Sequence, residues 1–372
     1  MRTSLLKLCL FVAVVAIAIV GYSSWAPSSA QAVAQTGQGP KLTSIGPLAF
    51  AADGTLFAAD NQSAAIYALD LGAQGAGAAN GAKGTDAIND KLAAMLGTEA
   101  REIAITDLAV HPRSKNAFVS VMRGQGAGAA PALFRVDGNG KIDMVALANV
   151  KFQKVDLPNA AVANPTARQN PRASVVTDMA FTDGRLWVAG LSNEEFASKL
   201  RAIPYPFANV DGGTSVEIYH GNHKQLETRS PVNAFVPYTL NNQPYLLAGY
   251  TCTPLVKFPL SDLKPGSKVR GTTIAEFGAG NRVLDMIVYK KGNQEFLLTA
   301  NNSRGVMKIP TTGFATAASI TTPVETETGG VPFETVTSMT GIEQLEKLDE
   351  QNSIVVARTA SGTLNLQIVP LP

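Results

Sequence analysis

Hydrophobic and polar positions alternate with a period of two in short runs along most of this chain, and glycine-containing turns separate the runs. The clearest example is Val176–Gly190, which reads VTDMAFTDGRLWVAG. An Asp-Gly pair, Asp183-Gly184, lies between two apolar runs, and this combination predicts a β-hairpin. The same order of strand, turn, strand, loop and strand recurs, which predicts a protein built from repeated small sheets.

Six such blocks follow one another after residue 41. Strands are expected, block by block, at Pro47–Phe50, Leu56–Ala59 and Ala65–Leu69; Thr106–Val110, Ala117–Val121, Leu133–Val136 and Ile142–Leu147; Val176–Gly190, Leu200–Ile203 and Ser215–Tyr219; Val232–Val236, Tyr245–Ala248, Leu255–Phe258 and Thr272–Phe277; Leu284–Tyr289, Glu295–Thr299 and Val306–Ile309; Val336–Met339, Ile354–Ala357 and Leu364–Val369. A four-stranded antiparallel sheet needs ~40–50 residues, and insertions lengthen it. Six blocks with little helix predict an all-β fold, a six-bladed β-propeller, which leaves few sheet edges exposed. A pair of β-sandwiches is the alternative, although its blocks should not repeat one internal order.

Only one segment changes to a helical period. In 85–97 the apolar residues fall at i, i+4, i+7 and i+8, which predicts a short amphipathic helix inserted between blades. Thr85 or Asp86 is the expected cap at its start, and Gly97 is the expected end. The polar segment 33–41 is expected to be a flexible lead-in, so that 42–372 forms a single propeller domain.

The first 32 residues have the features of a signal peptide. Arg2 and Lys7 precede the apolar run Leu8–Val20, and Ala30-Gln31-Ala32 is a small-residue cleavage signal. We therefore expect a secreted or periplasmic protein with no stable membrane anchor after cleavage. Removing Arg2 and Lys7 lowers the formal charge from +2 to 29 − 29 = 0, which argues against a nucleic-acid partner.

Three segments carry a resemblance to a known class of proteins: Ser44–Asp60, Thr177–Gly190 and Leu284–Asn302. As a pattern, the chain resembles the broad class of NHL-repeat and gluconolactonase-like six-bladed propellers. The resemblance implies a metal-dependent lactonase-like activity. Gluconolactonase-like enzymes carry a metal-binding glutamate in a Glu-Gly-Pro run in the first blade. The corresponding run here is Ile45-Gly46-Pro47, which lacks that carboxylate.

Polar residues recur at the start of the first strand of several blocks. Aligned positions are Asp107, Asp178, Asn233, Asp285 and Ser338, with Gly46 or Pro47 in the first block. The first strands of propeller blades line the central channel, so Asp107, Asp178, Asn233 and Asp285 are expected near one channel mouth. Their oxygens could bind Ca²⁺ or another divalent cation, with the three aspartates as metal ligands, or could orient a polar ligand. Alternatively, each carboxylate accepts hydrogen bonds from the backbone of a neighbouring blade.

A second candidate metal site combines His220 and His223 with the only cysteine after residue 32, Cys252. Two imidazoles and a thiolate suit a transition metal. The alternative is that both histidines lie in a surface turn and that Cys252 is an inert thiol.

Arg282, Asn301 and Arg304 flank the fifth block and are expected in a loop at one face of the disc. The two arginines could hold an anionic ligand, or they could pair with Asp285. No nucleophile elbow, phosphate-binding glycine loop or dinucleotide fingerprint is present in the sequence. We therefore expect an exported propeller that binds a small molecule or protein partner at one face without catalysis. The alternative function is a lactonase-like hydrolase that uses the channel carboxylates to hold a metal.

Overall fold

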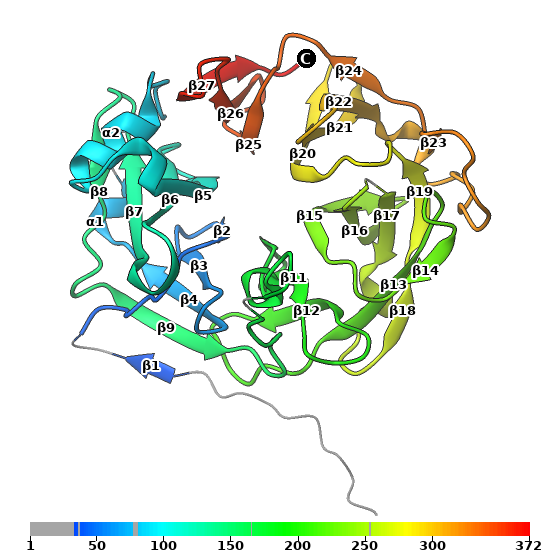
Figure 1. Cartoon of the computed structure of the whole chain (residues 1–372), viewed down its shortest axis with the longest axis horizontal. Helices are drawn as coiled ribbons and strands as arrows, with labels where there is room; N and C mark the ends of the chain where they lie inside the picture. The colour runs from blue at the N-terminus through cyan, green and yellow to red at the C-terminus, as the bar shows by residue number, and fades with distance from the viewer. Residues whose placement is uncertain (1–32, 36–37, 77–80, 165, 253) are drawn as a thin grey trace, which may run out of the picture.

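The computed structural model describes residues 33–35, 38–76, 81–164, 166–252 and 254–372. The predicted signal peptide, 1–32, lies outside the described residues. Six β-sheets are arranged around a central axis, so the predicted six-bladed β-propeller is confirmed (Figure 1). In the part of the chain that is described, no helix combines the length and apolar character that a membrane crossing requires.

The sheets are numbered here by the order in which their inner strands occur in the chain. Blade 1 contains β2 (Leu48–Phe50), β3 (Leu56–Asp60), β4 (Ala65–Asp70), β9 (Lys151–Asp156) and β1 (Val33–Gln35); blade 2 contains β5 (Ile103–Val110), β6 (Ala117–Arg123), β7 (Ala130–Val136) and β8 (Ile142–Met144); blade 3 contains β10 (Asp178–Thr182), β11 (Arg185–Leu191), β12 (Ser198–Pro204), β13 (Thr214–His220), β14 (Gln225–Glu227) and β18 (Lys268–Arg270); blade 4 contains β15 (Val232–Leu240), β16 (Gln243–Tyr250), β17 (Pro254–Pro259), β19 (Thr272–Glu276) and β23 (Gly329–Gly330); blade 5 contains β20 (Val283–Lys291), β21 (Gln294–Asn301), β22 (Gly305–Pro310) and β24 (Glu334–Val336); blade 6 contains β25 (Ile342–Lys347), β26 (Asn352–Arg358) and β27 (Leu364–Pro370). The α-helices are α1 (Ala73–Ala76) and α2 (Ile88–Met95), and short 3-10 turns occur at Ala100–Glu102, Gly126–Gly128, Pro171–Ser174, Leu260–Asp262 and Thr311–Gly313.

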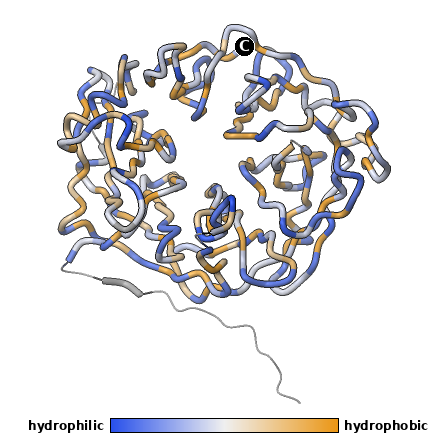
Figure 2. The backbone as a smooth tube through the Cα atoms, viewed as in Figure 1, coloured by the Kyte–Doolittle hydropathy of each residue, from blue (hydrophilic) through white to orange (hydrophobic). Residues whose placement is uncertain are grey.

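Apolar side chains hold the ring together at every junction between blades. Each of six buried clusters joins one pair of neighbouring blades, and Figure 2 shows the matching hydrophobic segments within the sheets. Between blades 1 and 3, for example, Phe57 and Val188 are both fully buried. The middle strands bury both faces because each sheet packs against two neighbours, which explains their nearly continuous apolar runs.

The order of the blades around the ring differs from their order in the chain. After β4 the chain builds the whole of blade 2 and then returns, because β9 pairs with β4 and completes blade 1. Contacts between inner strands give the spatial order 2, 1, 3, 4, 5, 6, with blade 2 between blades 1 and 6 (Figure 1). Blade 2 is therefore an insertion into blade 1. The ring closes where Thr85 bridges to Leu366 of β27 and α2 packs beside it.

Three details correct the sequence-based picture, and one confirms it. The predicted first strand of the sixth block, Val336–Met339, is wrong: β24 belongs to blade 5, and the inner strand of blade 6 is β25. Part of the expected lead-in, Val33–Gln35, forms β1 and pairs with β9. The helix ends near Gly97 as expected. Its N-terminal cap, however, is Ala87, with φ 49° and no side-chain hydrogen bond, and Thr85 instead bridges to β27 through its backbone.

Candidate functional site

The central channel contains two cavities, one after the other along the inner strands. The first, of about 480 Å³, lies where these strands begin and is called the channel mouth here; Asn233 and Arg282 line it. The second, of about 320 Å³, lies further along the same strands. Four partly buried carboxyl groups face this second cavity and are called the channel acids: Asp107, Asp178, Asp285 and Glu346.

A β-bulge positions the aspartates of blades 2 and 5. The pairing of β5 with β6 shifts by one residue between Ile105 and Asp107, and the pairing of β20 with β21 shifts between Val283 and Asp285. An extra residue in one strand changes the direction of the next side chain. The shift therefore turns Asp107 and Asp285 into the channel immediately after an irregular residue.

Each channel aspartate joins its own blade to the next one. The backbone N–H of Leu48 donates to Asp107 Oδ2 at 2.6 Å, that of Phe235 to Asp178 Oδ2 at 2.6 Å, and that of Leu345 to Asp285 Oδ2 at 2.8 Å. The other oxygen of each carboxyl group accepts from the N–H of the residue that follows it, at 2.7–2.8 Å. Hydrogen bonds to the backbone of a neighbouring blade were the predicted alternative to metal or ligand binding, and these bonds are of that kind.

The aspartates occur in every second blade around the ring. The equivalent position, one residue before the donated N–H, is Pro47 in blade 1, Ala234 in blade 4 and Gln344 in blade 6. The predicted alignment of Asn233 and Ser338 with the three aspartates is therefore wrong. Asn233 is the bulged residue before Ala234 and bonds through Nδ2 to Thr251 Oγ1 at 3.1 Å. Aspartates in alternate blades give the channel an approximate threefold arrangement of carboxyl groups.

Burial raises the pKa of all four channel acids. It raises the pKa of Asp107 to about 7 against the two backbone hydrogen bonds, which lower it. Burial, and then repulsion from Asp107, raise the pKa of Glu346 to about 8. The pKa of Asp285 is well above its ordinary value because burial and the charges of Asp107 and Asp178 act in the same direction. A partly protonated ring whose oxygens already accept N–H groups offers little negative charge to a hard cation.

The three predicted metal ligands of the channel do not form a compact set. Within the described residues, the potential ligand atoms that all lie within 4.8 Å of one another belong to His220, His223 and Cys252 instead. The aspartates stay apart because they lie on different blades and turn their oxygens toward backbone amides.

The residues expected beside blade 5 are divided between separate places. Arg282 is exposed at the channel mouth, and no ion pair of its side chain is found among the described residues. Arg304 pairs with Glu327 at 2.8 Å. Asn301 is buried and donates from Nδ2 to the carbonyl oxygen of Gly305 at 2.9 Å, so it supports a turn. The expected pairing of an arginine with Asp285 is not observed in the described part of the chain.

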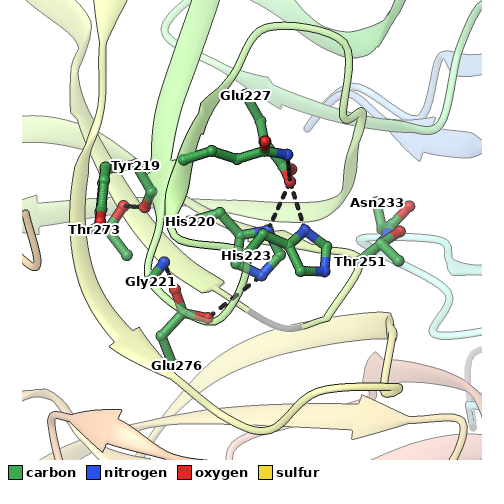
Figure 3. A network of polar contacts seen from close by, with 10 residues as sticks. Tyr219, His220, Gly221, His223, Glu227, Asn233, Thr251, Thr273 and Glu276 are labelled. Carbon is green, nitrogen blue, oxygen red and sulfur yellow. Dashed lines mark hydrogen bonds and ion pairs between the residues drawn. The ribbon is translucent and has the colours of Figure 1, made fainter. Parts of the chain in front are cut away.

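The His–Cys cluster, formed by His220, His223 and Cys252, lies at the junction between blades 3 and 4. Figure 3 shows its two histidines with the neighbouring glutamates. His220 ends β13 in blade 3, and His223 lies in the turn that follows. Cys252 lies between β16 and β17 of blade 4. Residues that are far apart in the sequence therefore meet because blades 3 and 4 pack together. The alternative that both histidines lie in a surface turn is wrong for His220, whose side chain is 0% exposed.

Two glutamates flank the histidines of this cluster. Glu227 Oε1 lies 2.5 Å from His223 Nδ1 and 3.1 Å from His220 Nδ1 (Figure 3). Glu276 Oε2 lies 3.6 Å from His220 Nε2, and Glu276 Oε1 accepts the N–H of Gly221 at 2.6 Å. Burial alone would raise the pKa of Glu227, but the neighbouring histidines outweigh it and lower the pKa to about 2. Burial raises the pKa of Glu276 to about 7.

Sequence reasoning missed Glu227, Glu276 and Glu346. Glu346 follows Gln344 by two positions on β25, so the alternation of an inner strand would have indicated it if that strand had been placed correctly. Glu276 has no such signal, because it reaches His220 only through the contact between blades 3 and 4. Glu227, in contrast, lies on β14, which pairs with β13 in the same blade, four residues after His223.

Comparison with known proteins supplies no family for this chain. No family model matches it, and neither does any curated protein. Solved structures that are similar include an aldose sugar dehydrogenase from Streptomyces coelicolor in its PQQ-bound form, with 12% identity, TM-score 0.37, and coverage of 92% of this chain and 100% of that one. A putative gluconolactonase (9% identity, TM-score 0.32, coverage 92% and 93%) and the WD40 propeller domain of Doa1 (7% identity, TM-score 0.31, coverage 92% and 97%) are also similar. At these values the similarity carries no argument about activity or ligands. The class of protein, a six-bladed β-propeller, rests on the six sheets themselves.

Proposed function

We propose that this chain is an exported β-propeller that binds a small anionic ligand at the channel mouth without catalysing its conversion. The observation that carries the proposal is the cavity of about 480 Å³ at the mouth, which is lined by the exposed Arg282, a residue without an ion pair among the described residues. An arginine recognises a carboxylate or phosphate through parallel hydrogen bonds. Export is inferred from the signal-peptide pattern in residues 1–32.

The composition of the wall supports a binding role. Met122 and Leu284 provide partly exposed apolar surface, and Arg282 and Asn233 add polar groups beside it. A concave apolar wall with a few placed polar groups is typical of small-ligand sites. The size of the cavity lies in the range of such sites, which span roughly 300–1,000 Å³.

The chemistry of the same wall supports the absence of catalysis. The described residues that line the mouth include no histidine, cysteine or lysine, and the one carboxylate among them, Glu343, is paired with Arg358. A general base needs a free titratable group within hydrogen-bond reach of the reacting atom. The mouth therefore has the parts of a receptor for an anion and lacks those of a hydrolase.

Replacing Arg282 tests this proposal. Small carboxylates, sugar acids and phosphate esters would be screened by thermal shift, and hits would be titrated by calorimetry. We expect Arg282→Gln to weaken binding of the hits by at least tenfold, since a charge-assisted pair contributes ~1.5–3 kcal/mol. Arg185→Gln is the matched control, because Arg185 is also exposed but lies outside the mouth.

Three results would contradict the proposal. The first is equal affinity of wild type and Arg282→Gln for every anionic hit, and the second is the absence of any anionic hit. The third is steady turnover of lactones by the purified chain, which would favour the hydrolase alternative.

A further inference from the structure

We propose that the His–Cys cluster binds one divalent transition-metal ion, with Zn²⁺ as the ion that best fits its donors. Nothing in the proposed ligand site at the channel mouth depends on this inference.

The donor set carries the first part of the argument. His220, His223 and Cys252 offer two imidazole nitrogens and one sulfur, and these ligand atoms all lie within 4.8 Å of one another. Imidazole and thiolate together are the preferred ligands of Zn²⁺, at bond lengths of ~2.0 and ~2.3 Å. Hard cations such as Ca²⁺ prefer oxygen ligands, so the donor set excludes them.

Buried polar atoms of His220 and Glu276 that lack hydrogen bonds are the second observation in favour of a metal ion. The ring of His220 is fully buried, yet neither Nδ1 nor Nε2 has a hydrogen-bond partner of acceptable geometry among the described residues. Glu276 Oε2 is buried without a hydrogen bond as well. Leaving a buried polar group unpaired costs ~1–3 kcal/mol, and more for a charged group. Coordination by an ion would give His220 Nε2 a bonded partner, since Glu276 Oε2 lies 3.6 Å away, too far for a hydrogen bond.

Glu227 fits the role of an outer partner that holds Nδ1 of both histidines. Glu227 Oε1 lies close to Nδ1 of both histidines, and Glu276 Oε2 lies on the Nε2 side of His220 (Figure 3). In metal sites a carboxylate commonly holds one nitrogen of a histidine so that the other nitrogen faces the ion. The two rings lie side by side, with centroids 3.8 Å apart and a tilt of 36°, which allows Glu227 to contact both.

Blade packing sets the position of the cysteine. Cys252 has a left-handed backbone conformation, with φ 60°, and its N–H donates to the carbonyl oxygen of Asn281 at 2.6 Å. A non-glycine residue adopts this conformation only when its surroundings hold it there. The adjacent Thr251 contacts the channel mouth through Asn233, so the metal site lies beside the ligand site but shares no donor with it.

The test uses the full chain after treatment with a chelator. Zn²⁺ would be titrated by calorimetry, and Co²⁺ would be titrated by absorption spectroscopy, because a thiolate ligand gives a sulfur-to-cobalt charge-transfer band. We expect one ion per chain. Cys252→Ser and His223→Gln should each weaken Zn²⁺ binding by at least tenfold, and Cys252→Ser should remove the band. His111→Gln is the matched histidine control, and Arg282→Gln should bind Zn²⁺ normally while losing the anionic ligand.

Three outcomes would overturn the inference: no binding of either ion at micromolar concentration, unchanged affinity in both cluster variants, or a cobalt spectrum without a thiolate band. A measurement on the wild type tests the site even if the variants fail to fold. Bound Zn²⁺ should slow the reaction of Cys252 with a thiol reagent severalfold, and an unchanged rate would also refute the site.

Discussion

The channel acids and the His–Cys cluster both place ionisable side chains at junctions between blades, yet they differ in what those side chains contact. Each channel aspartate has a backbone N–H on each of its two oxygens. In the cluster, both nitrogens of His220 and one oxygen of Glu276 have no hydrogen bond within the described residues. Burial raises the pKa of Asp107 and of Glu276 to about 7 in both places. A shifted pKa therefore does not distinguish structural acids from a binding site. The two regions differ instead in the buried atoms of His220 and Glu276 that have no hydrogen bond within the described residues.

The largest expected effect is the loss of a channel aspartate. Asp285→Ala leaves the N–H groups of Leu345 and Met286 without their acceptor. We expect the free energy of unfolding to fall by ~2–4 kcal/mol, because two partly buried donors lose their partner. Urea denaturation measures it. Gln344→Ala, at the equivalent position of blade 6, is the matched control and should cost less than ~1 kcal/mol. Equal losses in the two variants would mean that the aspartates do not join the blades.

A smaller effect is expected from pH. The pKa of Asp107 is about 7 in the folded chain and 3.8 ordinarily, so the unfolded chain loses this proton first as pH rises. Stability from this group is complete below pH ~4 and is lost as pH rises through ~7. With solvent present in the channel we expect a loss of ~1–2 kcal/mol. Denaturation midpoints of wild type and Asp107→Asn at pH 4 to 8 measure it, and the difference between the two should shrink at low pH. Parallel curves would show that folding does not raise the pKa of Asp107.

The smallest effect on stability is expected in the cluster. Glu276→Gln keeps an oxygen for the N–H of Gly221 and replaces a carboxyl oxygen that has no hydrogen bond within the described residues, so the metal-free chain should change by less than ~1 kcal/mol. Glu276→Ala removes that acceptor and should cost ~1–3 kcal/mol. Thermal unfolding in the presence of chelator compares them. A large loss in Glu276→Gln would show that the carboxylate is structural, like the channel acids.

Much of the architecture was predictable from the local pattern. Alternating runs around turns such as Asp183-Gly184 located strands in every block, because the side-chain period of a strand is written in the sequence itself. The same pattern placed Asp107, Asp178 and Asp285 on inner strands of the channel. It misplaced the inner strand of blade 6 because the short strand at Glu334–Val336 has the same local pattern and belongs to another sheet.

Features that depend on contact between distant segments could not be predicted from the local pattern. The return of β9 to β4 makes blade 2 an insertion, and no local feature of Lys151–Asp156 specifies its partner strand. The meeting of His220 with Cys252 likewise depends on how blades 3 and 4 pack. By itself, then, the sequence determined a ring of six sheets with acids on its inner strands, since periodicity and turns are local properties. Only the tertiary structure decided that the acids would bond to backbone while two histidines and a cysteine converged, because partner choice is set by the packing of whole blades.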